Sequence, residues 1–181
     1  MKERHVALLR GINVGRANRI AMGDLRALFE RLGYGDVRTL LNSGNLVFTV
    51  SGAAASDAGS RIEKAMTTRL GVSARVIVIK AKELAAIVAE NPLGGLMEDP
   101  SRFLVTVLAS AADRNRLEEL QKKNWAPEAL AVGRRAAYLW CAAGILKGPL
   151  NLAVSRALGD AGTSRNWATT LKLLALAEEE A

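Results

Sequence analysis

The hydrophobic and polar positions of residues 1–80 alternate in a pattern that predicts six secondary-structure elements. Short apolar runs bounded by turn-forming residues indicate strands, and apolar residues that recur at three- and four-residue spacing indicate helices. The expected strands are residues 5–9, 37–41, 46–50 and 76–79, and the expected helices are residues 25–32 and 60–70. The resulting order, strand-helix-strand-strand-helix-strand, is typical of a ferredoxin-like domain.

Three local signals mark turns and helix ends in this half of the chain. The sequence NSGN at residues 42–45 joins two apolar runs and predicts an antiparallel hairpin. Gly33 is the expected C-terminal cap of the first helix. The sequence SRIE at residues 60–63 has the form of a capping box and predicts that the second helix begins at Ser60 and continues to Leu70.

The second half of the chain repeats this order of elements. A linking helix is expected at residues 82–90, because Asn91-Pro92 would end it, and residues 93–100 are expected to form a loop. The expected elements that follow are a strand at 103–108, a helix at 113–123, hairpin strands at 129–132 and 137–141, a helix from Pro149, a loop or vestigial strand at 159–164 and a last helix at 166–179 with Trp167, Leu171 and Leu174 on one side.

Together the two halves predict an α+β fold of two ferredoxin-like subdomains with antiparallel sheets, plus a C-terminal helix. The expected domains are residues 1–80 and residues 101–181, with a linking helix and loop at residues 81–100. The halves share no convincing sequence identity, so an approximate duplication is inferred from the order of elements alone.

Charge adds a preference for anionic partners. The formal net charge is +7, and it is uneven: residues 1–90 hold 14 Lys and Arg against 8 Asp and Glu, whereas residues 91–181 hold 11 against 10. A positive field attracts anions without distinguishing phosphates, nucleotides and nucleic acid. Ordinary solubility charge explains the same numbers equally well.

Cysteine and hydropathy restrict the environment. Cys141 is the single cysteine, so no intramolecular disulfide is possible and a reducing compartment fits. The N-terminal residues lack a signal-peptide core, and the longest apolar run, Ala136 to Leu146, is too short to span a bilayer. We therefore expect a soluble, cytoplasmic protein without a membrane partner.

Most catalytic and metal-binding patterns are missing from the sequence. One histidine and one cysteine, far apart, supply no zinc or haem site, so no metal site is predicted, although a carboxylate-bound magnesium stays open. No Ser-His or Cys-His pair supports a covalent nucleophile, and Cys141 is expected to be a small buried apolar residue. Whether the protein is an enzyme, and which cofactor it would use, stays open.

The stretch LRGINVGRAN, residues 9–18, interrupts this scaffold with two glycines, two asparagines, two arginines and no acid. Gly11 and Gly15 would let backbone amides point into a concavity able to hold an anion. A P-loop needs four residues between its glycines, followed by lysine and Ser or Thr; here three residues intervene and Arg16 follows. The dinucleotide fingerprint is missing as well. A tight turn after the first strand is the competing explanation of these glycines.

Three separated motifs, LRGINVG, LNSGNLVF and TSRNWATTLKL, resemble a bacterial family of uncharacterised proteins called domain of unknown function sixteen ninety-seven. The resemblance covers nearly the whole chain in the right order. It implies an α+β fold of two ferredoxin-like subdomains and no established biochemical activity. The sequence departs from the family pattern at Arg16, where a second glycine is common, and at Lys147, to which we give no role.

The resemblance and the polarity of the three motifs lead to one site hypothesis. The candidate ligand-binding residues are Arg10, Asn13, Gly15, Asn18, Ser43, Asn45, Arg165 and Asn166. Amides and hydroxyls supply directional hydrogen bonds, and arginine binds phosphate or carboxylate through two donors. We therefore expect one polar pocket for a small anionic ligand.

Three alternatives stay open. The same polar residues would equally cap turns and helices, with Trp167 in the core. An RNA- or DNA-binding module would need exposed strand aromatics, and the relevant strands offer only His5 and Phe48. A protein-interaction scaffold would show a contiguous apolar surface instead.

Overall fold

The structure is a computed structural model that describes residues 2–179, apart from the side chains of residues 52 and 53. The chain forms two compact units. The first unit comprises the chain up to Leu84 together with the segment that starts at Leu173, and the second unit runs from Ala85 to Lys172. The division of the chain into domains 1–80 and 101–181, joined by residues 81–100, stays a prediction.

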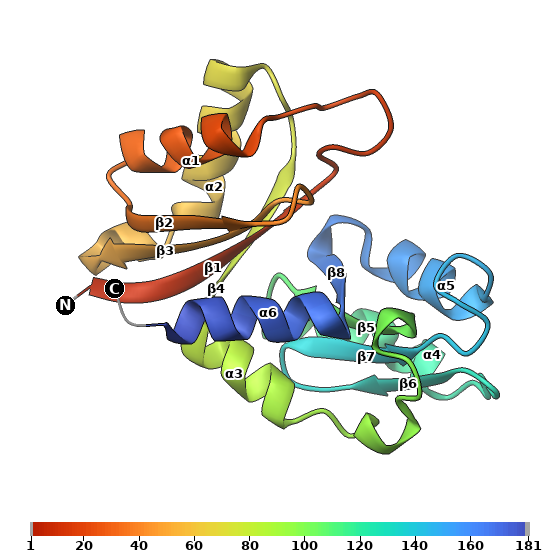
Figure 1. Cartoon of the computed structure of the whole chain (residues 1–181). Coiled ribbons are helices and arrows are strands. Elements are labelled where there is room, and N and C mark those ends of the chain that lie inside the picture. Colours follow the sequence, from red (N-terminus) through yellow and green to blue (C-terminus); the bar gives the residue numbers. More distant parts are fainter. Residues whose placement is uncertain (1, 180–181) are drawn as a thin grey trace. The chain divides into compact units, whose positions relative to one another are not determined.

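The first unit contains a four-stranded antiparallel sheet with two helices on one face (Figure 1). Its elements are β1 (Lys2–Arg10), α1 (Met22–Arg31), β2 (Gly35–Leu40), β3 (Asn45–Ser51), α2 (Ala58–Ala65) and β4 (Arg75–Lys80), and the strand order is β2-β3-β1-β4. Leu25 and Phe29 of α1 pack with Ile62 of α2 over Leu9 and Phe48 of the sheet. The expected strands, the first helix and the hairpin are confirmed.

The second unit contains a second four-stranded antiparallel sheet. Its elements are β5 (Phe103–Leu108), a 3-10 segment (Ala111–Leu117) that continues into α4 (Glu118–Gln121), β6 (Ala129–Val132), β7 (Ala136–Trp140), α5 (Pro149–Leu158) and β8 (Gly162–Asn166), in the strand order β6-β7-β5-β8. Leu150 and Val154 of α5 pack on Leu104 and Leu139 of one sheet face. On the opposite face, Tyr138 donates a hydrogen bond to the Ile87 carbonyl at 2.6 Å.

Two helices, α3 (Ala81–Ala89) and α6 (Trp167–Glu178), contain residues of both units. The prediction that Asn91-Pro92 ends the linking helix is confirmed. The apolar stripe of the last helix differs from the expected one: Leu173 and Ala177 are buried, whereas Leu171 is 41% exposed. Residues 171–177 are apolar on all sides except at Lys172, so the sequence pattern could not select the buried side.

The predicted capping box at residues 60–63 is wrong. The helix begins at Ala58, so Ser60 lies inside its first turn, and Asp57 is the N-cap residue. The Glu63 carboxylate instead accepts a hydrogen bond from the Val76 amide at 2.7 Å and pairs with Arg75 at 3.2 Å. A residue expected to cap α2 therefore joins α2 to β4.

The helix expected at residues 113–123 begins earlier and is mostly of the 3-10 type. Ser110 and Asp113 form a capping box in which the Asp113 carboxylate accepts from the Ser110 amide at 2.9 Å, which starts the helical segment at Ala111. The segment expected as a loop or vestigial strand is β8, which pairs with β5.

Candidate functional site

The loop between β1 and α1, residues 11–21, is organised by Asn13. Its Oδ1 accepts from the Ile20 amide at 2.8 Å, and its Nδ2 donates to the Ile20 carbonyl at 3.0 Å and to the Asn42 carbonyl at 2.7 Å. Both the oxygen and the nitrogen of the Asn13 side-chain amide thus form hydrogen bonds within the protein. Asn13, predicted as a ligand contact, closes the loop and joins it to the turn after β2.

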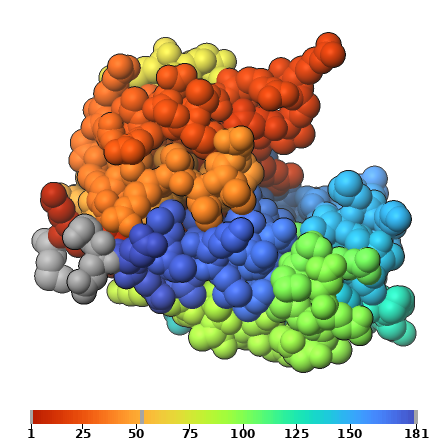
Figure 2. Space-filling model, viewed as in Figure 1, coloured from red at the N-terminus to blue at the C-terminus, as the bar shows by residue number. Residues whose placement is uncertain are grey.

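Backbone conformation explains the glycines and asparagines of this loop. Gly11, Asn13, Gly15 and Asn18 all have positive φ, between 50° and 83°, a region that glycine and asparagine tolerate best. Asn18 Nδ2 donates to the Gly11 carbonyl at 3.0 Å, and the Asn13 amide donates to the Asn18 carbonyl at the same distance. The loop projects from the first unit, as Figures 1 and 2 show. Its polar side chains fix a strained backbone.

The second motif lies against the first. Asn45 is fully buried, and its Nδ2 donates to the Leu40 carbonyl and to Ser43 Oγ, both at 2.9 Å. The Leu9 amide donates to the Gly44 carbonyl at 2.8 Å. Together with the contact between Asn13 and Asn42, these bonds bring the loops of the first two motifs together within the first unit.

A pocket of about 440 Å³ opens where the two loops meet the start of α1. Its lining residues are Asn13, Arg19, Ile20, Ala21, Met22 and Asn42. Ala21 is the N-cap residue of α1 and makes no side-chain cap hydrogen bond, so no side chain of the N-cap covers the first-turn amides. The lining of the pocket therefore includes one arginine, two asparagines and three apolar residues.

Sequence reasoning missed Arg19, although a signal was present. Arg19 is the third arginine of an acid-free stretch that also contains Arg10 and Arg16, but it lies one residue beyond the motif of residues 9–18. Asn42 contributes through its backbone carbonyl, which no side-chain pattern reveals. Arg10, at the end of β1, is opposite Arg75 of β4, whose guanidinium pairs with the Glu63 carboxylate at 3.2 Å.

The third motif belongs to the second unit. Arg165 Nη1 donates to Thr163 Oγ1 at 3.0 Å and to the Ser164 carbonyl at 2.8 Å, and burial lowers the pKa of Arg165 to about 10, so it is charged at neutral pH. Asn166 Oδ1 accepts from the Thr169 amide at 2.8 Å and so caps the first turn of α6. That Arg165 and Asn166 join the residues of the first two motifs stays a prediction.

Other reactive groups have structural surroundings. Cys141 is buried, and burial raises the pKa of its thiol to about 11, so it is almost entirely protonated near neutral pH. Within residues 2–179, no group of three or more His, Cys, Asp or Glu side chains is placed to hold a metal ion. None of the helices described has the length and apolar character needed to cross a membrane.

Comparisons with known proteins bear on the family and the fold. A family model described as "Protein of unknown function (DUF1697)" matches residues 1–138. A solved structure, the conserved bacterial protein SP0830 from Streptococcus pneumoniae, is similar with a TM-score of 0.76 at 20% sequence identity, over 98% of this chain and 100% of that chain. No curated protein matches the chain. The first two motifs lie within the matched residues, and the third lies beyond them.

Proposed function

Because the chain belongs to the DUF1697 family, whose function is unknown, its role has to be argued from its own residues, and we propose that the first unit binds a small anionic ligand. The ligand carries a phosphate or carboxylate group and occupies the pocket beside the loop of residues 11–21. The observation that carries this proposal is Arg19, which lines a pocket of about 440 Å³ at the uncapped start of α1.

Charge supports an anion in this position. Arg10, Arg16 and Arg19 follow one another along the loop without an intervening acid; the first acid is Asp24, within α1. A guanidinium donates two parallel hydrogen bonds to a phosphate or carboxylate, and backbone amides at a helix start add further donors. The apolar lining residues Ile20, Ala21 and Met22 suit a ligand whose anionic group is attached to a carbon skeleton.

The roles within this site differ from those that the sequence suggested. Asn13, Asn18, Ser43 and Asn45 are proposed to hold the loops in place rather than to contact the ligand, because their side-chain amides and hydroxyl take part in bonds within the protein. The arginines are then the ligand contacts. Arg165 and Asn166 belong to the second unit and also bond within the protein, so their contribution to ligand binding is a separate proposal.

We also infer that each unit is a ferredoxin-like domain and that the chain is an approximate duplication. The matching strand orders β2-β3-β1-β4 and β6-β7-β5-β8 support this inference, as does the shared antiparallel pairing. In both sheets the first strand of the unit lies in the middle, between the third and the fourth.

The nucleic-acid alternative would require exposed aromatic side chains on the first and third strands. His5 and Phe48, the aromatic residues available on the first and third strands, are 3% and 0% exposed and pack against each other with ring centroids 5.9 Å apart. Base stacking on a ferredoxin-like sheet requires exposed aromatic side chains. The proposal of a small anionic ligand does not depend on them.

Thermal unfolding of the whole chain tests the proposal. The probes are inorganic phosphate, a nucleoside monophosphate and a dicarboxylate such as succinate. At least one of them is expected to raise the Tm, since a ligand at a hundredfold excess over its Kd stabilises the native state by about 2.7 kcal/mol. Arg19→Gln should remove this gain. Arg26→Gln is the matched control, because Arg26 is an exposed arginine of α1 that pairs with Glu30 at 2.9 Å.

The result that would contradict the proposal is an unchanged Tm with every probe, or an undiminished gain in Arg19→Gln. Arg10→Ala is also expected to reduce the gain. Arg165→Ala tests the third motif separately: if that variant keeps the full gain, the contribution of Arg165 is refuted while the pocket of the first unit stands.

A further inference from the structure

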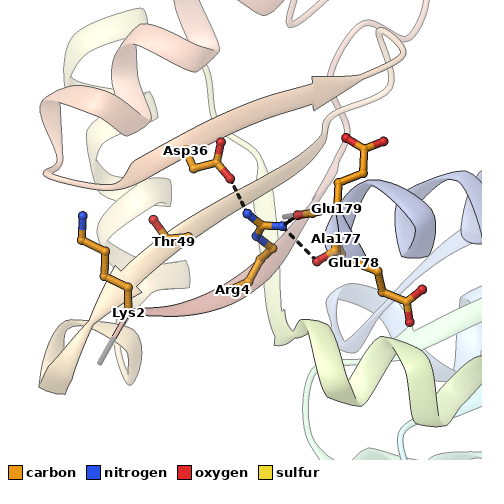
Figure 3. Close-up of a pocket in the computed structure, with 7 residues that line it drawn as sticks. All are labelled: Lys2, Arg4, Asp36, Thr49, Ala177, Glu178 and Glu179. Atoms are coloured by element: carbon orange, nitrogen blue, oxygen red, sulfur yellow. Dashed lines mark hydrogen bonds and ion pairs between the residues drawn. The ribbon is translucent and has the colours of Figure 1, made fainter. Parts of the chain in front are cut away.

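The end of α6 is held on the first unit by an arginine from β1. Arg4 Nη1 donates to the Ala177 carbonyl at 3.4 Å and to the Glu179 carbonyl (Figure 3). The last carbonyls of a helix have no partner within the helix. Arg4 therefore caps the C-terminal turn of α6 from a residue more than 170 positions earlier in the chain.

The Asp36 carboxylate lies between Arg4 and Arg38 and bonds to both. Asp36 Oδ2 pairs with Arg4 Nη2 at 2.5 Å, and Asp36 Oδ1 accepts from Arg38 Nε at 3.0 Å. Arg38 Nη1 in turn pairs with the Glu179 carboxylate at 2.7 Å. Asp36 has a φ of 44°, and the register of β2 against β3 shifts between Gly35 and Arg38. This β-bulge redirects the side chains of β2 locally.

The last turn of α6 buries few apolar side chains. Leu173 and Ala177 are buried and Leu176 is half-buried, whereas Glu178 and Glu179 are exposed. Ala177 offers a single methyl group, whose burial contributes only about 0.8 kcal/mol. Arg4, Asp36 and Arg38 therefore add polar contacts to a turn with a small apolar attachment.

Dissolved ions have access to these charges. A pocket of about 490 Å³ adjoins them and is lined by Lys2, Arg4, Asp36, Thr49, Ala177, Glu178 and Glu179. The Glu179 side chain is 60% exposed and that of Arg38 is 28% exposed, whereas those of Asp36 and Arg4 are 23% and 15% exposed, so screening acts mainly on the pair of Arg38 and Glu179. Exposed ion pairs are screened by salt, with a Debye length of about 30 Å at 0.01 M and about 3 Å at 1 M.

We propose that Arg4, Asp36 and Arg38 form a salt-sensitive latch that holds the C-terminal turn of α6 on the first unit and releases it when the charges are screened. The helix that the latch anchors begins at Trp167, directly after Arg165 and Asn166. The latch therefore controls whether the helix that follows the third motif is anchored at its far end. This proposal does not depend on ligand binding at the loop of residues 11–21.

Hydrogen exchange of the whole chain at about 0.01 M and about 1 M salt tests the latch. The amides of residues 175–179 are expected to exchange about tenfold faster at high salt, because release frays the last turn. Asp36→Asn should give the fast rate at both salt concentrations. Asparagine accepts positive φ as aspartate does, so the substitution removes the charge while the backbone is retained. Arg26→Gln, which breaks an exposed ion pair of the same unit, should behave like the wild type.

Results of two kinds would overturn the proposal. One is exchange at residues 175–179 that differs less than twofold between the two salt concentrations in the wild type, or full protection in Asp36→Asn. The other is an equal loss of protection at Val6, Leu8 and Val47, which lie buried in the first sheet and should stay protected if only the last turn of α6 is released.

Discussion

The connection from the first strand to the first helical segment differs strongly between the two units. In the second unit, β5 passes into its helical segment through Ala109 and Ser110, closed by the capping box of Ser110 and Asp113. In the first unit, β1 passes into α1 through residues 11–21, which project from the unit and adopt left-handed backbone at four positions. Because a short capped turn is enough for the topology, the long loop is an addition that the fold itself does not require.

The β-hairpins of the two units, β6-β7 and β2-β3, also differ in the backbone conformation of their turns. Between β6 and β7 the turn is closed locally, with the Gly133 amide donating to the Ala136 carbonyl at 2.8 Å. Between β2 and β3, Leu41 has a φ of 59° although it is neither glycine nor asparagine, and its side chain is 52% exposed. Strain of this kind persists only where the surroundings enforce it, and it gathers at functional sites. Three non-glycine residues with positive φ, Asn13, Asn18 and Leu41, lie in the two loops that meet at the proposed pocket, and a fourth, Asp36, lies in β2.

The largest loss of stability is expected for a substitution at Gly44, in the turn between β2 and β3. Gly44 has a φ of 82°, and an added Cβ would lie 2.7 Å from Leu9 Cβ and 2.9 Å from Ile12 Cδ1. Gly44→Ala should lower the free energy of unfolding by about 3 kcal/mol, from left-handed backbone and overpacking together. Gly15→Ala, at a φ of 61° with nothing within 4 Å, should cost only about 1 kcal/mol. Urea unfolding measures both, and equal losses would contradict the close contact between the two loops.

Asn13 is expected to come next. Asn13→Ala removes the bonds to both backbone groups of Ile20 and to the Asn42 carbonyl, and it should destabilise the protein by about 2 kcal/mol and weaken the phosphate response. Ser110→Ala, at the corresponding turn of the second unit, should cost about 1 kcal/mol and leave ligand binding unchanged. Unfolding and binding of both variants should be measured together. Loss of binding in Ser110→Ala would contradict the proposal that the loop of the first unit, and not the turn of the second, supports ligand binding.

A smaller difference in stability is expected between substitutions at two buried tyrosines, one in each unit. Tyr138 in the second unit donates to the Ile87 carbonyl, whereas the buried Tyr34 hydroxyl has no hydrogen-bond partner among the described residues. Tyr138→Phe should cost about 1 kcal/mol at neutral pH, and Tyr34→Phe should be neutral or stabilising. Urea unfolding of both variants checks this, and an equal loss in the two would contradict it.

The pH dependence of Tyr138 follows from the same burial. Burial raises the pKa of Tyr138 from 10.0 to about 12, so the folded state holds its proton more tightly than the unfolded state does. Its contribution to stability is present below pH 10 and is lost as the pH rises towards 12. Tyr138→Phe should remove this part of the pH dependence in urea unfolding above pH 10.

Sequence patterns were sufficient for most of the fold because its elements are marked locally. Apolar runs located the strands, and Gly33, with a φ of 86°, follows the end of α1 as expected. Helix starts were harder, since a capping box depends on where the chain enters the helix: Ser60 and Glu63 have the right spacing but lie inside α2. Glu63 bonds instead to Val76, a partner that no local pattern reveals.

Of the candidate site, the structure shows that the first two motifs adjoin, whereas the role of each residue stays a prediction. The motif around Arg10 and Asn13 does adjoin the motif around Asn45, as the bonds between the two loops show. Sequence alone could not show that the Asn13 side chain forms hydrogen bonds with Ile20 and Asn42, because such bonds form between segments that only the folded chain brings together. Arg19 differs in this respect: it lies one residue beyond the motif of residues 9–18, so the motif does not identify it.

Amide NMR spectra of the whole chain during a phosphate titration test the central claim most directly. The amides of residues 11–24 should shift with saturable dependence on phosphate, while those of residues 109–113, at the equivalent turn of the second unit, should not move. Arg19→Gln should abolish the shifts, and Arg26→Gln should preserve them. Equal shifts at the two turns, or shifts that persist in Arg19→Gln, would contradict the assignment of an anion site to the first unit.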